Sequence, residues 1–173
     1  ISLAILPDAH KGRLLELISS FRQAGGKLIF DNNYRSQLWQ QSQACLWYAR
    51  IMAQTDLALL TDEDEFAIYC EQQLAQIISR CMALKIPEAV IKRGIGKALV
   101  LDKSDLCEVP AQRVEPVVDT SAAGDAFAAG FLSRWLQNTS GQQAAEAGHR
   151  LAARVIQYPG AIIAPEDMSD LTQ

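Results

Sequence analysis

Hydrophobic positions along the chain follow two spacings. Residues 9–24 place their apolar side chains three or four positions apart, which is the spacing of one helix face. Similar patterns predict helices over residues 42–53, 74–84, 123–137 and 142–157, and a further helix that opens at the acidic run 61–65. Short apolar runs typical of strands occur at residues 3–6, 27–31, 56–60, 88–92 and 97–102. A glycine turn at 94–96 separates the last two runs, which are expected to form a hairpin.

Strands that alternate with helices predict an α/β fold with a largely parallel central sheet. No repeat or long linker interrupts the alternation, so we expect one domain or most of one. Ligands of such sheets bind beyond the carboxyl ends of the strands. Residues 31–35, 61–65 and 92–96 each follow a predicted strand, which indicates that they meet at a single site.

The composition restricts the class of protein. A length of 173 residues with 49% hydrophobic residues suits one domain with a full core. The formal net charge is -4 and both signs are mixed along the chain, which gives no support to a nucleic-acid partner. The four cysteines lack metal-ligand spacing, and neither a signal peptide nor an apolar run of about 18 residues is visible. We therefore expect reduced thiols, no membrane segment and a cytoplasmic location.

The chain begins without Met, directly in the apolar run 1–6. A buried strand is a poor natural N-terminus because chain ends usually lie in solvent. We interpret residues 1–173 as the C-terminal portion of a longer protein.

Residues 118–130 carry the clearest chemistry, because Asp119 and Asp125 flank a turn of small residues that leads into a helix pattern. N–H groups at a helix start bind anions, so Ala122, Ala123 and Gly124 are candidates for a phosphate-binding turn. A carboxylate there can accept the proton of a hydroxyl that attacks a phosphoryl group, which makes Asp125 a candidate general base. The alternative is an aspartate that only caps a helix.

The run Asp119-Thr120-Ser121-Ala122-Ala123-Gly124-Asp125 resembles the C-terminal signature D-T-x-G-A-G-D of the ribokinase-like carbohydrate kinases, with Ala122 in place of the first Gly. The segments 1–6, 31–39 and 155–163 are similar to one subgroup, the 2-keto-3-deoxygluconate kinases. The resemblance runs through nearly all of the chain. It implies a three-layer ribokinase-like fold in which residues 1–173 are the C-terminal nucleotide-binding portion, with the N-terminal half and the lid absent from this chain.

The resemblance implies that ATP phosphorylates 2-keto-3-deoxygluconate to its 6-phosphate, with Mg²⁺ as a cofactor and Asp125 as the base. The substrate is a sugar acid, and the planar guanidinium of Arg35 suits its carboxylate. A loop arginine paired with Asp31 is the alternative. The resemblance also places Asn33 and Tyr34 near the nucleotide and the sugar.

Residues 92–97 look like the nucleotide loop of the family. Gly94 and Gly96 let the backbone approach a ligand, and the phosphates would meet the cations Lys92, Arg93 and Lys97. A basic β-turn is the alternative, and no Walker G-x(4)-G-K-[ST] motif occurs.

Two further positions are candidates for nucleotide contact. Thr61 follows a predicted strand at the expected edge of the sheet. His149 matches a family position that lines the adenine pocket, whereas a lone helical histidine is otherwise a surface or core side chain.

The resemblance implies two cation sites. Asp62 and Glu65 keep the spacing of the N-x-x-E motif that organises Mg²⁺ through water, with Asp in place of Asn, and the alternative is a plain acidic helix start. Asp119 and Ser121, together with the turn 158–160, match a site in relatives where backbone oxygens hold a monovalent cation such as K⁺.

Two other functions stay open. One is a kinase for fructose, ribose or a nucleoside, and the other is a non-catalytic nucleotide-binding piece. Because the sugar-covering lid and the dimer contacts of relatives precede this portion, residues 1–173 alone are expected to have little activity, and the full-length protein is expected to be a homo-oligomer.

Overall fold

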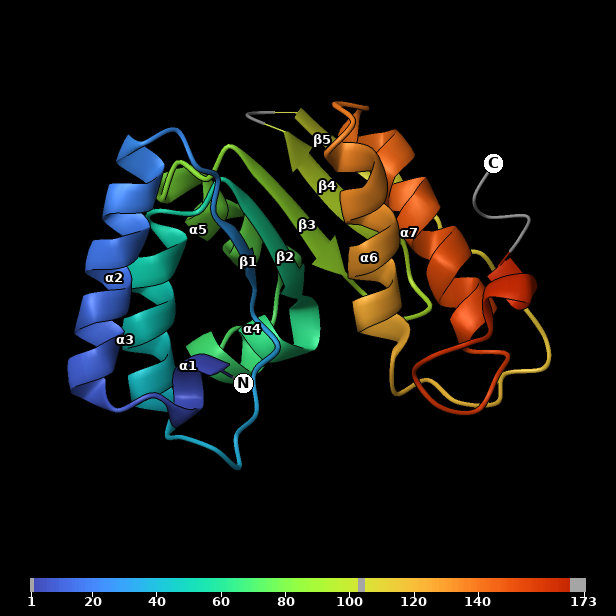
Figure 1. Cartoon of the computed structure of the whole chain (residues 1–173), viewed down its shortest axis with the longest axis horizontal. Coiled ribbons are helices and arrows are strands. Elements are labelled where there is room, and N and C mark those ends of the chain that lie inside the picture. Colours follow the sequence, from blue (N-terminus) through green and yellow to red (C-terminus); the bar gives the residue numbers. More distant parts are fainter. Residues whose placement is uncertain (1, 103–104, 169–173) are drawn as a thin grey trace. The chain divides into compact units, whose positions relative to one another are not determined.

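The computed structural model describes residues 2–102 and 105–168 (Figure 1). Its helices are α1 (Ser2–Ile5), α2 (Asp8–Gln23), α3 (Gln41–Met52), α4 (Asp62–Tyr69), α5 (Leu74–Ala83), α6 (Ala123–Trp135), α7 (Gly141–Val155) and the 3-10 helix η1 (Pro165–Met168). Its strands are β1 (Ile29–Asp31), β2 (Leu57–Thr61), β3 (Glu88–Lys92), β4 (Ala98–Asp102) and β5 (Asp105–Val109). The strands form one five-stranded sheet in the order β1-β2-β3-β4-β5, so the predicted α/β class is confirmed.

The sheet combines parallel and antiparallel neighbours. β1 and β2 are parallel, with Ile29 opposite Leu57 and Asp31 opposite Leu59. The helices α4 and α5 connect β2 to β3, as parallel neighbours require. Residues 93–97 join β3 to β4 and residues 103–104 join β4 to β5, and connections this short suit only antiparallel neighbours. The predicted parallel part therefore comprises β1 to β3, and the predicted hairpin begins the antiparallel part.

The contacts of the chain divide it into two units. The first unit comprises Ile1–Ile91 and Leu101–Asp105, and the second comprises Lys92–Val100 and Leu106–Gln173. In the first unit α2 and α3 lie side by side (Figure 1). Their shared core consists of Leu3, Tyr34, Trp39, Ala44, Trp47, Tyr48, Ile51 and Ile68, with Leu14 and Leu15 of α2 packed against it.

The strand predicted at residues 3–6 is wrong, because residues 2–5 form the short helix α1. A short apolar run has no periodicity that separates a strand from a helical turn. In the helical conformation Leu3 is buried in the core beside α3, while Ile5 stays exposed. β5 is not among the predicted strands, because only Val109 of its residues is buried and the segment lacks an apolar run.

The second unit is built on the packing of α6 against α7 (Figure 1). Two glycines permit the close approach, because a Cβ on Gly130 would lie 2.6 Å from the carbonyl oxygen of Ala147, and one on Gly148 would lie 2.9 Å from that of Phe127. Backbone of one helix thus touches backbone of the other. The rings of Phe127 and Phe131 stack beside this contact, with their centroids 6.2 Å apart.

Replacing Gly130 by Ala is expected to lower the free energy of unfolding by about 1–3 kcal/mol, because the new methyl group would meet backbone that cannot move away cheaply. Chemical denaturation measures the change. Gly12→Ala in α2 is the matched control: no atom lies within 4 Å of its Cβ position. That substitution is expected to stabilise the protein by up to about 1 kcal/mol through helix propensity. Equal effects at the two positions would contradict the packing account.

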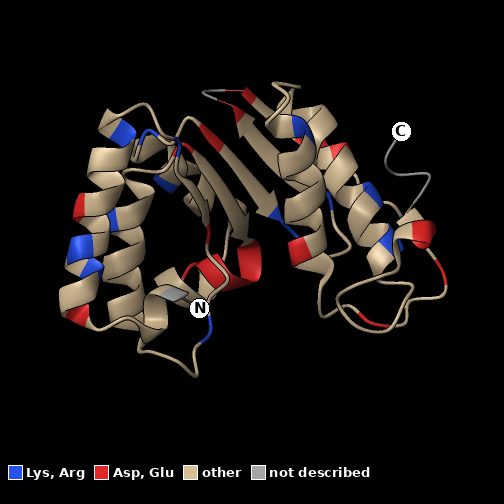
Figure 2. Cartoon of the chain, in the orientation of Figure 1, with Lys and Arg blue, Asp and Glu red and all other residues tan. Residues whose placement is uncertain are grey.

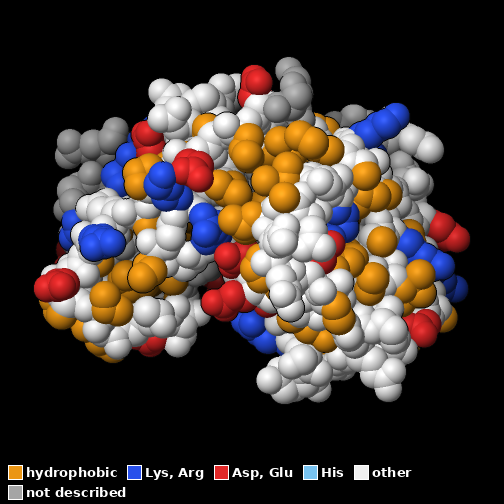
Figure 3. Space-filling model, turned by 180° about the vertical axis from the view of Figure 1, so that it is seen from behind, with side chains coloured by type: hydrophobic (Ala, Val, Ile, Leu, Met, Phe, Trp, Pro, Cys, Tyr) orange, Lys and Arg blue, Asp and Glu red, His pale blue; other side chains and the backbone are white. Residues whose placement is uncertain are grey.

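Charged residues of both signs are interspersed along the elements (Figure 2), and their side chains are interspersed over the face seen from behind (Figure 3). The acidic first turn of α4 is the clearest concentration of one sign, with four consecutive carboxylates (Figure 2). No helix in the described ranges combines the length and apolarity needed to cross a bilayer.

Candidate active site

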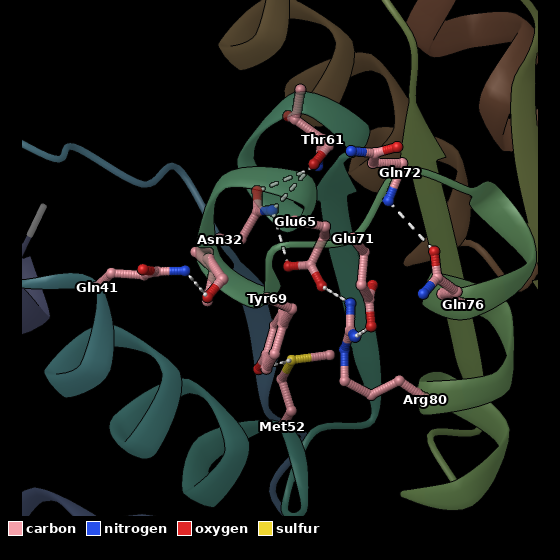
Figure 4. A network of polar contacts seen from close by, with 11 residues as sticks. Asn32, Gln41, Met52, Thr61, Glu65, Tyr69, Glu71, Gln72, Gln76 and Arg80 are labelled. Carbon is pink, nitrogen blue, oxygen red and sulfur yellow. Dashed lines mark hydrogen bonds and ion pairs between the residues drawn. The ribbon is translucent and has the colours of Figure 1, made fainter.

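Asn32, directly after β1, joins the carboxyl ends of β1 and β2 (Figure 4). Its Nδ2 donates to the carbonyl oxygen of Thr61 at 3.3 Å and to Oε1 of Glu65 at 3.0 Å. Its Oδ1 accepts the N–H groups of Thr61 at 3.1 Å and of Asn33 at 2.8 Å. Every polar group of this buried amide is thus used, and the backbone of Thr61, predicted to touch a nucleotide, is bound to it.

Glu65 forms a buried ion pair with Arg80 of α5 (Figure 4). The distance from Oε2 to Nη2 is 2.6 Å, and the Glu65 side chain is 0% exposed. Arg80 also pairs with Glu71, and its guanidinium carbon lies 3.6 Å from the ring centroid of Tyr69. Burial raises the pKa of the Glu65 carboxyl above its usual value, and the hydrogen bonds from Arg80 and Asn32 oppose this effect.

The role expected for Asp62 and Glu65 around Mg²⁺ stays a prediction, and both residues have contacts within the protein. Asn32 and Arg80 occupy the two oxygens of Glu65 inside the protein. Asp62 accepts the N–H of Glu63 at 2.9 Å, as an acidic residue at a helix start does. Within residues 2–102 and 105–168, no three His, Cys, Asp or Glu side chains are grouped to hold a metal ion. The contact of Asp62 agrees with the alternative of an acidic helix start, whereas Glu65 is bound inside the protein.

The segment after Asn32 presents Arg35 and buries Tyr34. Asn33 has a φ of 29°, and the N–H of Tyr34 donates to Oδ2 of Asp64 at 3.0 Å. The Tyr34 ring lies in the core of the first unit, which leaves its backbone rather than its ring for ligand contact. Arg35 is exposed, and its Nη1 donates to the carbonyl oxygen of Tyr34 at 3.3 Å. Among the described residues Arg35 has no carboxylate partner, so the alternative pairing with Asp31 does not form.

In the second unit, Asp125 lies in the first turn of α6 and is exposed. Its carboxylate has no hydrogen-bond or ion-pair partner in the described part of the chain, so it is not used as a helix cap. The N–H of Ala123 donates to the carbonyl oxygen of Thr120 at 3.1 Å. Ala122 is buried, so the amides that remain available to bind a phosphate are chiefly those of Gly124 and of its neighbour in the first turn.

Lys92 brings a positive charge to the same turn. Its Nζ lies 3.9 Å from the position that a Cβ of Gly124 would take. The Lys92 side chain is largely buried, and Lys92 ends β3 while Gly124 lies in the first turn of α6. An ammonium, helix N-terminal amides and an exposed carboxylate therefore share one small region of the second unit, which is an arrangement suited to a phosphate group and an adjacent base.

The predicted nucleotide loop is a tight turn. Gly94 has a φ of +54°, which favours glycine, and the N–H of Gly96 donates to the carbonyl oxygen of Arg93 at 2.8 Å. Lys97 pairs with Glu108 at 2.6 Å, and this contact lowers the pKa of the Glu108 carboxyl. The basic β-turn that was the alternative is therefore present, and a role in nucleotide binding stays a prediction.

Asp119 and His149 both have structural contacts. The two oxygens of Asp119 accept the N–H groups of Ser121 at 2.8 Å and of Gly160 at 3.1 Å, and the contacts to Ser121 and Gly160 lower its pKa. Asp119 thus ties together the turns expected to hold K⁺. His149 is buried against Phe127, and its Nε2 lies 3.2 Å from the carbonyl oxygen of Val109. Burial lowers the pKa of His149, which favours a neutral ring, so its place in an adenine pocket stays a prediction.

A surface cavity of about 340 Å³ lies along α6 and α7. Its lining includes Ser133, Arg134 and Arg150, and none of the residues predicted from the sequence to bind ligands. The candidate residues of the second unit therefore lie outside this cavity.

Comparison with protein families identifies the relatives of the chain. The pfkB family of carbohydrate kinases matches residues 1–168. The chain belongs to the pfkB family. A 2-dehydro-3-deoxygluconokinase from Dickeya dadantii (strain 3937) is 46% identical over 172 residues, which are 97% of this chain and 56% of the relative. This pfkB chain thus spans about half the length of the curated relatives that it matches.

Two solved structures share the fold of this pfkB chain. A fructokinase from Vibrio cholerae O395, in a form with fructose, ADP and calcium ion bound, has a TM-score of 0.80 at 24% identity and is matched over 98% of this chain and 55% of that one. An aminoimidazole riboside kinase from Salmonella enterica, complexed with aminoimidazole riboside and an ATP analog, has a TM-score of 0.78 at 24% identity, over 92% and 56% of the two chains. The ribokinase-like fold predicted from the sequence is confirmed.

Proposed function

We propose that the whole protein is a kinase that transfers the γ-phosphate of ATP to the 6-hydroxyl of 2-keto-3-deoxygluconate, which is also named 2-dehydro-3-deoxygluconate. The observation that carries the proposal is the exposed carboxylate of Asp125, which has no partner among residues 2–102 and 105–168 and directly follows Gly124, whose Cβ position lies 3.9 Å from Nζ of Lys92. The similarity to the Dickeya dadantii enzyme supports the substrate.

In the proposed reaction Asp125 accepts the proton of the attacking hydroxyl. The sugar oxygen then forms a bond to the γ-phosphorus while the bond from that phosphorus to the bridging oxygen breaks, and ADP leaves. The N-terminal amides of α6 and the ammonium of Lys92 stabilise the negative charge on the transferred group. Mg²⁺ enters with ATP, as part of the nucleotide substrate.

Arg35 supplies the proposed preference for a sugar acid. Arg35 is exposed and keeps most of its N–H donors, since within the described part of the chain its guanidinium donates only to the carbonyl oxygen of Tyr34. A planar fork of donors binds a carboxylate at two points. The second candidate function is a kinase for fructose, and the likeness to the fructokinase structure is the observation in its favour. Fructose has no carboxylate to bind, so a role of Arg35 in substrate binding distinguishes the two functions.

Replacing Arg35 by Ala is expected to lower kcat/KM for 2-keto-3-deoxygluconate by about 10- to 100-fold, because hydrogen bonds to a charged group are lost. Steady-state kinetics of the whole protein with this sugar acid and with fructose measure the change, and fructose turnover should not fall. Arg13→Ala on the exposed face of α2 is the control. Equal turnover of fructose and the sugar acid by the unmodified enzyme would overturn the substrate assignment.

The activity of residues 1–173 without the rest of the protein has to be considered separately, because this chain spans about half the length of its relatives. We propose that residues 1–173 alone bind ATP weakly and turn over little. Robust kinase activity from this chain would contradict that proposal and would place the complete catalytic machinery within it.

A further inference from the structure

The segment that carries Arg35 is held by the first turn of α4, the turn whose sequence suggested Mg²⁺ binding. The carboxylate of Asp64 accepts the N–H of Tyr34 at 3.0 Å, one residue before Arg35. We propose that Asp64 is a positioning residue for Arg35: it fixes the Asn33–Tyr34 peptide, which directly precedes the peptide that joins Tyr34 to Arg35, and so contributes to binding of the substrate carboxylate. This inference rests on the proposed role of Arg35 in the proposed function.

Contacts of Asn32, Asn33 and Tyr34 hold the segment that leads to Arg35, and the hydrogen bond from the Tyr34 N–H to Asp64 is one of them. The Asn32 side chain is bound to Thr61 and Glu65, and the carbonyl oxygen of Asn32 accepts the hydroxyl of Tyr48. Asn33 follows with a φ of 29°, a conformation that residues other than glycine rarely adopt and that persists only where neighbouring contacts hold it. The Tyr34 ring is anchored in the core.

The direction of the Arg35 side chain depends on the Tyr34–Arg35 peptide. The hydrogen bond to Asp64 fixes the preceding peptide, Asn33–Tyr34, and burial of the Tyr34 ring holds the residue between the two peptides, so both contacts constrain the backbone that leads into Arg35. The carbonyl oxygen of Tyr34 accepts the Arg35 guanidinium at 3.3 Å. A hydrogen bond to an ionised acceptor is stronger than one between neutral groups, so a carboxylate suits this position.

The same turn offers a matched control. Glu63 precedes Asp64, is exposed, and its backbone N–H rather than its side chain is bonded within the turn. Changing Glu63 therefore alters the charge of the turn by the same amount without touching the segment 32–35. A general effect of negative charge near a bound nucleotide would change both variants alike, whereas positioning of Arg35 requires Asp64 alone.

The test compares Asp64→Ala, Asp64→Asn and Glu63→Ala in the whole protein. Asp64→Ala is expected to raise KM for 2-keto-3-deoxygluconate by about tenfold, the effect of losing one hydrogen bond to a charged group, with KM for ATP unchanged. Asp64→Asn keeps an acceptor oxygen and should restore most of the affinity. Glu63→Ala should behave as the unmodified enzyme.

Amide hydrogen exchange of the peptide that contains residues 32–36 gives a second readout that needs no turnover. Exchange should be faster in Asp64→Ala than in Glu63→Ala. Unchanged exchange together with an unchanged sugar KM, or a KM for ATP that rises as much as that for the sugar, would overturn the positioning role. If the unmodified enzyme prefers a neutral sugar, the proposed function fails, while the exchange of residues 32–36 still decides whether Asp64 holds the segment.

Discussion

Replacing Asp125 by Asn is expected to lower kcat of the whole kinase by about 10²- to 10⁴-fold, because the amide keeps the shape of the side chain but cannot accept the proton of the attacking hydroxyl. The exposed carboxylate has no other partner among the described residues, so its removal breaks no contact within the fold. KM for both substrates should change little. An assay of ADP release at saturating sugar acid and ATP measures the effect.

The matched control is Asp102→Asn, which changes another exposed aspartate, at the end of β4. Its kcat should equal that of the unmodified enzyme, and circular dichroism should show both variants folded. An Asp125→Asn enzyme with normal kcat would exclude Asp125 as the base. A loss confined to KM for ATP would instead assign Asp125 to nucleotide binding.

Much of the fold could be predicted from the sequence because its helices carry clear periodicity. The predicted helix at 123–137 appears as α6 (Ala123–Trp135), and that at 9–24 appears as α2 (Asp8–Gln23). Errors occurred where burial and periodicity are weak. The run 3–6 is too short to show a period, and β5 buries only Val109, so neither segment has a pattern that identifies it.

The candidate site was only partly predictable for a different reason. The turn at Gly124 and Asp125 is local, and its small residues and helix start can be recognised in a continuous stretch of sequence. Asn32 and Arg80 were not predicted, because Asn32 meets Glu65 across 33 positions and Arg80 meets it across 15. No spacing rule reports contacts between separate elements.

Glu65 illustrates the limit of spacing. Asp62 and Glu65 lie three positions apart, so they can share one side of a helix. Spacing does not say which of them points to the interior. The structure buries Glu65 completely and leaves Asp62 in the partly exposed first turn, so the two carboxylates have different surroundings and their joint role around Mg²⁺ stays a prediction.

Replacing Glu65 by Ala is therefore expected to lower the free energy of unfolding by about 3–5 kcal/mol, the usual result of breaking a buried ion pair by removing one partner. The Arg80 guanidinium, whose side chain is 15% exposed, would lose the carboxylate at 2.6 Å. The Nδ2 of Asn32 would also lose an acceptor at 3.0 Å. Urea denaturation of the variant, followed by circular dichroism, measures the loss.

The control and a second substitution separate this ion pair from a general charge effect. Glu63→Ala removes an exposed carboxylate from the same turn and should change stability by no more than about 0.5 kcal/mol. Adding Arg80→Met to Glu65→Ala removes the stranded charge and fills part of its volume, so the double variant should regain part of the loss. The opposite result is that Arg80→Met lowers the free energy of unfolding of the Glu65→Ala variant by as much as it lowers that of the unmodified protein. This result would show that the two side chains contribute independently. In that case the contacts of Arg80 with Glu71 and Tyr69, rather than its pair with Glu65, would hold α5 against this part of the first unit.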